Sequence, residues 1–180
     1  MNSTDRPFAL WERLLDMHRA QPFSALLMGG DQVYADSIWT VVPSVKEWNA
    51  LPLNEKLKRK ATATMLAQLD RFYCELYCER WRQAQQAEAF ACIPTVMMWD
   101  DHDIIDGWGS FPEKLQQCEV FQAIYKAAAK YFELFQLRSF TDNTSRIGKQ
   151  TSGGYYSLGL KFRGYTILAL DNRSERSIQE

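Results

Sequence analysis

In the stretch TVMMWDDHD, residues 95–103, an apolar run passes directly into a cluster of acids. FSALLMGGD, residues 23–31, and YTILALD, residues 165–171, repeat this pattern of an apolar run followed by an aspartate. Short apolar runs are typical of buried strands, and ligands of open α/β sheets bind where such strands end. We therefore predict an α/β fold whose strands deliver Asp31, residues 100–103 and Asp171 to one edge of a sheet.

The rest of the chain alternates helical and strand-like segments. Apolar spacing predicts an amphipathic helix over residues 7–20 and another over 116–137, and residues 155–160 and 165–170 look like two strands around a turn. Residues 55–91 hold no Gly or Pro and predict a long helical stretch with a break or kink, after a short helix near residues 45–50. Such alternation favours parallel α/β architecture in a single domain, residues 1–180.

Composition excludes some classes of function. The net charge is −1 and the pI about 6.2, which argues against a partner such as nucleic acid held mainly by phosphate contacts. No apolar run approaches the roughly 20 residues that span a bilayer, and the first residues lack the pattern of a signal peptide. We expect no membrane partner and a cytoplasmic protein, or a periplasmic or secreted one if the true N-terminus is missing. The oligomeric state stays open.

The four cysteines do not suggest a disulfide framework or a zinc site. Cys74 and Cys78 lie one helical turn apart, and no CxxC pair occurs. We expect reduced, mostly buried thiols.

The loop MWDDHDIIDGWGS, residues 98–110, carries the strongest chemical signal. Five acids or imidazoles fall within nine residues and repel one another unless a cation is present. Oxygen-rich ligand sets favour Mg, Ca, Mn or iron, and an imidazole widens that choice. The alternative is a solvated acidic loop, although Trp99 and Trp108 bracket the acids and make it less convincing.

A second loop, GGDQVYAD, residues 29–36, offers further ligands. Asp31 follows a strand, and Tyr34 could turn its phenol to the same point. A phenolate suits trivalent iron, whereas the alternative is a plain turn with a capping Asp and a packed Tyr. Only two histidines occur, and His18 lies on a helical apolar face. His102 is therefore the candidate for proton transfer, since neither a GxSxG motif nor a P-loop is present.

GGDQVYAD, WDDHD and LDNRSER, in this order, resemble the PhoD-type alkaline phosphatases (alkaline phosphatase D) among the calcineurin-like metallophosphoesterases. The resemblance spans roughly residues 20–177. It implies part of an αββα sandwich that is helix-rich, with strands ending in metal-site loops. It also implies hydrolysis of phosphate mono- or diesters, small molecules, by a centre of two metal ions: iron and/or Ca, Mn, Mg or Zn.

The resemblance assigns roles by motif. Asp31 resembles the aspartate that bridges both metals, and Tyr34 resembles the tyrosine ligand of the iron site. Asp101 stands where the superfamily's Gly-Asn-His-Asp/Glu motif has Asn and would hold the second metal. His102 matches the histidine that stabilises the transition state or protonates the leaving group. In the same family-typical stretches, Asp103 would orient other groups, Asp36 and Asp171 have weaker assignments, and Arg173 could pair with a phosphate oxygen or with Asp171.

The chain departs from the superfamily at both ends. An Asp-x-His motif should precede residue 29, and a histidine and then Gly-His-x-His should follow residue 176, but neither is found. We therefore expect a central, truncated segment of such an enzyme with an incomplete site. Two other readings stay open: a non-catalytic remnant that acts through protein contacts, and a small metal-binding module without hydrolysis.

Overall fold

The structure, a computed structural model, describes residues 9–138, 156–174 and 176. Four strands lie within this part of the chain: β1 (Leu26–Met28), β2 (Thr95–Met97), β3 (Leu158–Phe162) and β4 (Tyr165–Ala169). The helices there are α1 (Ala9–Ala20), α2 (Ile38–Val41), α3 (Pro43–Asn49), α4 (Leu53–Lys56), α5 (Ala63–Trp81), α6 (Ala84–Cys92), α7 (Glu113–Gln116) and α8 (Glu119–Tyr131), and α8 continues into a π-helical stretch, η1 (Phe132–Leu137).

Strands β1 and β2 pair in parallel, with Leu26 opposite Thr95 and Met28 opposite Met97. This pairing confirms that residues 23–31 and 95–103 bring their acidic loops to one edge. Strands β3 and β4 form the pair around a turn that the sequence predicted, and they lie antiparallel in a sheet of their own. The expectation of one parallel sheet carrying all three acidic ends is therefore wrong. The turn Arg163–Gly164 is too short for the crossover that parallel strands need.

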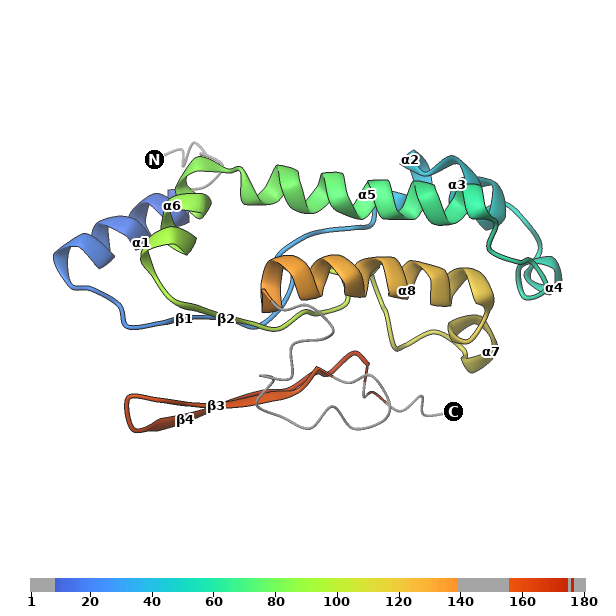
Figure 1. Ribbon diagram of the computed structural model, residues 1–180. Coiled ribbons are helices and arrows are strands. Elements are labelled where there is room, and N and C mark those ends of the chain that lie inside the picture. Colours follow the sequence, from blue (N-terminus) through green and yellow to red (C-terminus); the bar gives the residue numbers. More distant parts are fainter. Residues whose placement is uncertain (1–8, 139–155, 175, 177–180) are drawn as a thin grey trace, which may run out of the picture.

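Figure 1 shows the parallel pair between a layer of helices on one side and the β3–β4 hairpin on the other. Helices α5 and α8 lie side by side in the helical layer, and α1 packs against α6 beside them. This mixture of helices and small sheets agrees with the α/β class. The αββα sandwich stays a prediction.

The long helical stretch predicted for residues 55–91 is interrupted twice. Residues 57–62 are not helical, and Thr62 begins α5 by accepting the backbone N–H of Met65 at 3.1 Å. The expected break falls at Arg82 and Gln83, where extended backbone at Gln83 starts α6. The change of direction lets Phe90 pack edge-on against Trp11 of α1, with ring centroids 5.6 Å apart. Packing thus overrides local helix propensity here.

Aromatic side chains fill the core beneath the acidic loops. Trp99 and Trp108, which bracket the acids in the sequence, are both buried. Trp99 stacks on Phe132 with centroids 4.3 Å apart, and Trp108 stacks on Tyr125 at 5.3 Å. Stacked aromatic pairs of this kind add to the stabilisation from area burial. The loop over residues 98–110 is therefore anchored on the apolar face of α8 rather than free in solvent.

The structure also bears on the cysteines and on membrane spans. The four cysteines are free thiols, but the prediction that most are buried is wrong, since Cys118 alone of the four is buried and Cys92 is exposed. Among the helices of the described ranges, none is long and apolar enough to cross a membrane.

Candidate metal centre

The loops after β1 and β2 approach each other closely at Gly30 and Asp100. Gly30 has a φ of 135°, and a Cβ built on it would lie 2.4 Å from the Cβ of Asp100. Only glycine accommodates both that backbone conformation and that approach. The next residue, Asp31, has a φ of 56°, in the left-handed region that aspartate tolerates better than most residues. The glycines of GGD therefore let the Asp31 loop lie against the Asp100 loop.

The carboxylate of Asp103 links the two loops by accepting hydrogen bonds from the backbone of both. Its side chain is fully buried, and one carboxylate oxygen accepts the backbone N–H groups of Asp31 at 2.8 Å and of Asp100 at 2.9 Å. The other oxygen accepts the side-chain N–H of Gln136 at 2.7 Å and the backbone N–H of Val33 at 3.3 Å. Burial raises the pKa of Asp103 to about 6, although these four donors favour the ionised form. Asp103 thus orients the loops, the role that the resemblance implied for it.

Three side chains converge near Asp103: those of Asp31, Asp101 and His102. Each offers a ligand atom, and these three atoms lie within 4.8 Å of one another at half-buried positions. Ligands that share one first-row metal ion lie roughly 4 Å apart or less, so a small contraction would close the set. The structure therefore brings Asp31 to Asp101 and His102, which follow it by 70 and 71 positions in the sequence.

The state of Asp31 fits a cation at this cluster. Its Oδ1 atom is buried and has no hydrogen-bond partner among the described residues. Burial raises its pKa, and the negative charges of Asp100 and Asp101 raise it further. An orphaned, partly desolvated carboxylate oxygen is costly unless a cation or a donor satisfies it. The donor set of two carboxylates, an imidazole and a nearby phenol suits a hard or borderline metal ion.

Asp101 differs from Asp31 because both of its carboxylate oxygens have partners. Oδ2 accepts the backbone N–H of Gly107 at 2.8 Å, and Oδ1 accepts an N–H of Arg173 at 3.1 Å. Burial works against its charge, but the Gly107 N–H and Arg173 outweigh it, and the pKa of Asp101 is lowered. Asp101 is therefore held ionised.

His102 is oriented by Asp36. Its Nδ1 atom lies 2.6 Å from Asp36 Oδ2, while Asp36 Oδ1 accepts the backbone N–H of Asp106 at 2.9 Å. Burial opposes the charged imidazolium, but the hydrogen bond and charge of Asp36, with the charges of Asp31 and Asp101, outweigh it and raise the pKa of His102. This pairing leaves Nε2 free of Asp36, and a raised pKa suits a proton donor.

Tyr34 reaches the cluster as its spacing from Asp31 predicted. Its hydroxyl lies 3.4 Å from Asp31 Oδ2, a long hydrogen bond, and its ring lies 4.5 Å from that of His102. The negative charge of Asp31 is the main cause of a raised pKa at Tyr34, so the phenol is neutral in the absence of a metal ion. The assignment of Tyr34 as an iron ligand stays a prediction.

Arg173 is positioned beside the cluster by Asp171, the residue that follows β4 and Leu170. Asp171 is buried and accepts the indole N–H of Trp99 at 2.9 Å and the backbone N–H of Arg173 at 3.0 Å. The guanidinium forms ion pairs with Asp100 and Asp101 rather than with the Asp171 carboxylate. The pairing with Asp171 that the sequence suggested therefore involves the backbone of Arg173, not its charge.

All five predicted site residues thus lie close together, at the edge where β1 and β2 end. The sequence did not reveal which residues hold them in place. Gln136 of η1 is buried and bonds to both Asp103 and Tyr77. A polar residue among the apolar positions of a predicted helix was the one available signal for it. The sequence indicated Asp36 only through its family-typical stretch. Its partner, His102, lies too far along the chain for spacing to predict the pairing.

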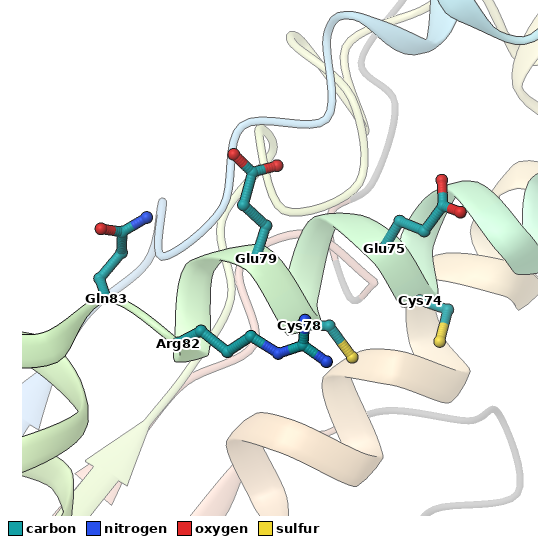
Figure 2. Close-up of a pocket in the computed structure, with 6 residues that line it drawn as sticks. All are labelled: Cys74, Glu75, Cys78, Glu79, Arg82 and Gln83. Atoms are coloured by element: carbon teal, nitrogen blue, oxygen red, sulfur yellow. The ribbon is translucent and has the colours of Figure 1, made fainter.

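Two of the hollows on the described surface can be compared by the residues that line them. One of about 620 Å³ adjoins the cluster and is lined by Asp100, Ser157, Leu170, Asp171, Asn172, Arg173 and Arg176. The other, of about 500 Å³, lies along α5, and Figure 2 shows the thiols of Cys74 and Cys78 on the opposite side of that helix from Glu75 and Glu79. Burial raises the pKa of the Cys78 thiol, which makes it a poor nucleophile and a poor metal ligand. The α5 hollow therefore offers no comparable chemistry.

Comparison with known proteins gives two matches. The sequence model of a family described as PhoD related phosphatase matches residues 7–180. Among curated proteins, the chain is similar to an uncharacterized protein of Saccharomyces cerevisiae, with 30% identity over 210 aligned residues. The match covers 96% of this chain and 29% of the yeast protein, so the chain spans less than a third of that relative's length. No solved structure matches the chain.

Proposed function

Because the chain belongs to the family of PhoD related phosphatases, we propose that it carries the metal-binding loops of an enzyme that hydrolyses phosphate esters. The observation that supports this most directly is the convergence of Asp31, Asp101 and His102 within 4.8 Å, with Asp31 Oδ1 left without a partner among the described residues. The substrate class is a small phosphate mono- or diester. Metal ions are indicated by the family and by this cluster together.

The proposed centre holds two metal ions. Asp31 would help to hold both ions, Tyr34 would hold the ion of an iron-type site and Asp101 the other ion, and the metals would be iron and/or Ca, Mn, Mg or Zn. When bound, such ions polarise phosphoryl oxygens and lower the pKa of a water molecule to generate a nucleophile near neutral pH. The chain contributes the position of the carboxylates, which Asp103 fixes through backbone N–H groups.

His102 is the proposed proton donor to the departing alkoxide. Asp36 holds Nδ1, so the opposite nitrogen, Nε2, carries the proton that is transferred. In the metal-free protein its raised pKa keeps a larger protonated fraction near neutral pH than an unperturbed histidine has. A general acid of this kind contributes roughly 10²–10⁴-fold to the rate.

Arg173 is proposed to pair with a phosphate oxygen. Three of its five N–H groups face Asp100, Asp101 and the carbonyl of Trp108, which leaves two for a ligand. The adjoining hollow of about 620 Å³ would hold the alcohol part of the ester. Because Ser157 and Asn172 line that hollow, it suits a polar leaving group.

A second candidate is a metal-binding segment that does not hydrolyse esters by itself. The observation in its favour is that Asp101, a proposed ligand, is already paired with Arg173. The two candidates make different predictions about turnover but agree about metal binding.

Hydrolysis of p-nitrophenyl phosphate and of bis(p-nitrophenyl) phosphate tests the proposal. The purified chain should hydrolyse one of them slowly, with a rate that requires added Mn²⁺ or iron and is lost in Asp31→Asn and His102→Ala. Asp16→Asn removes an exposed carboxylate on α1 and should leave the rate unchanged. Metal binding without turnover would favour the second candidate, and a rate indifferent to metal and to Asp31→Asn would refute both.

A further inference from the structure

The half-buried guanidinium of Arg173 lies beside the carboxylates of Asp100 and Asp101. Arg173 forms ion pairs with Asp100 and Asp101, and its side chain is 16% exposed. A third contact joins its Nη1 to the carbonyl oxygen of Trp108 at 3.2 Å. A guanidinium held on three sides in this way supplies a fixed positive charge.

This charge lies where a metal ligand is proposed. Oδ1 of Asp101 accepts from Arg173 Nη2 at 3.1 Å, and Oδ2 accepts from Gly107. Asp31, in contrast, has an oxygen without a partner among the described residues. A cation can therefore join Asp31 without disturbing Arg173, but a cation that approaches Asp101 meets a positive charge already in contact with that carboxylate.

We propose that Arg173 is an internal counter-cation, which takes the place of the second metal ion beside Asp101 and gives up that contact when the ion binds. This inference rests on the metal centre of the proposed function. It assigns Arg173 a role in the metal-free protein, where its charge keeps Asp100 and Asp101 from repelling each other. Arg173 is then a positioning residue for the metal site before it meets any substrate.

The surroundings allow the side chain to move while its backbone stays. The backbone N–H groups of Arg173 and Ser174 are both held by Asp171 Oδ1. Arg173 lines the hollow of about 620 Å³ and Asp101 does not, so open space adjoins Arg173. An N–H released from Asp101 would face that hollow and could bind an anionic oxygen there. Metal binding would thus make a further N–H group of Arg173 available to a phosphate ester.

Mn²⁺ titration by calorimetry compares wild type with Arg173→Gln, which removes the charge. The variant should bind Mn²⁺ more tightly, by on the order of tenfold, because a competing charge has been removed. Arg176→Gln is the matched control, since Arg176 lines the same hollow but forms no ion pair with Asp101 in the described part of the chain. Equal or weaker Mn²⁺ affinity in a folded Arg173→Gln would overturn the inference.

Thermal unfolding gives a second reading. Without metal, Arg173→Gln should unfold at a lower temperature than wild type, because the half-buried carboxylates of Asp100 and Asp101 lose a partner. Mn²⁺ should raise the unfolding temperature more in the variant than in wild type. The same increase in both would contradict competition for Asp101.

The variant Asp31→Asn separates this inference from the proposed centre. If Asp31→Asn leaves Mn²⁺ binding intact, the centre itself is misplaced. If Asp31→Asn abolishes binding while Arg173→Gln does not strengthen it, the counter-cation role alone fails. Should Arg173→Gln not fold, the Nε–H resonance of Arg173 in wild type, identified with Arg173→Lys, must shift on saturation with Zn²⁺. A resonance that stays unchanged would overturn the inference.

Discussion

The carboxylate of Asp103 accepts the backbone N–H of Asp31 at 2.8 Å, across 72 positions of sequence. The same oxygen accepts the N–H of Asp100 at 2.9 Å, so one buried side chain sets the distance between the two acidic loops. The positions of Asp31 and Asp101 therefore depend on Asp103, which holds the backbone of both loops.

Replacement of Asp103 by Asn should destabilise the protein. The amide keeps one acceptor but turns an NH₂ group toward backbone donors, so at least one buried N–H loses its partner. Hydrogen bonds to charged groups are worth roughly 1.5–3 kcal/mol each, and we expect a loss of about 2–4 kcal/mol in the free energy of unfolding. Urea denaturation measures it, with exposed Asp16→Asn as the control. If the free energy of unfolding falls no more than in the control, Asp103 does not hold the two loops together.

Gly30→Ala should separate the two loops, whereas Gly29→Ala should not. A Cβ at Gly30 would lie 2.4 Å from Asp100 Cβ, but a Cβ at Gly29 meets no atom within 4 Å. The positive φ at Gly30 adds strain of roughly 1–3 kcal/mol. Thermal unfolding of the two variants compares the positions directly. Similar unfolding temperatures for both would mean that the close approach of the loops is not required.

The Asp36–His102 pair predicts a dependence of stability on pH. The pKa of His102 is raised above its usual 6.5, so the folded protein binds that proton more tightly than the unfolded chain. The resulting stabilisation is fully present below about pH 6.5 and is lost as the pH rises through the folded-state pKa. In metal-free protein, Asp36→Asn should therefore cost more stability at pH 5.5 than at pH 9.

Proton NMR checks the same pair without unfolding. Two histidines occur, so His18→Gln assigns the two imidazole titrations. Asp36→Asn should lower the pKa of His102, because it removes the carboxylate charge and weakens the hydrogen bond to Nδ1. An unchanged His102 titration would contradict the role of Asp36.

The sequence predicted the parts of this molecule whose signals are local. The apolar runs at residues 23–28 and 95–99 predicted two strands, and the strand cores, β1 and β2, pair in parallel with their acidic loops adjacent. The Tyr34 spacing correctly placed a phenol near Asp31. The turn at residues 161–164 likewise predicted the β3–β4 hairpin.

The sequence could not predict features that depend on contacts between distant residues. The polar partners of Asp103 and Asp171 lie on η1 and on the loop after β2, and neither contact leaves a periodic pattern. The helical stretch breaks at Arg82 and Gln83 although no Gly or Pro lies there, because α6 turns to pack on α1. Arg173 pairs with Asp100 and Asp101 rather than with the Asp171 carboxylate only because the hairpin brings it there.

The metal site at Asp31 and Asp101 is tested most directly by a Mn²⁺ titration followed by electron paramagnetic resonance. The signal of free Mn²⁺ should fall when wild-type protein is added, because the ion binds at the carboxylates of Asp31 and Asp101, beside His102. It should persist with the double variant Asp31→Asn, Asp101→Asn, provided circular dichroism shows that this variant is folded. Equal loss of the free-ion signal with both proteins would place the metal elsewhere and remove the basis for a phosphoesterase centre at these loops.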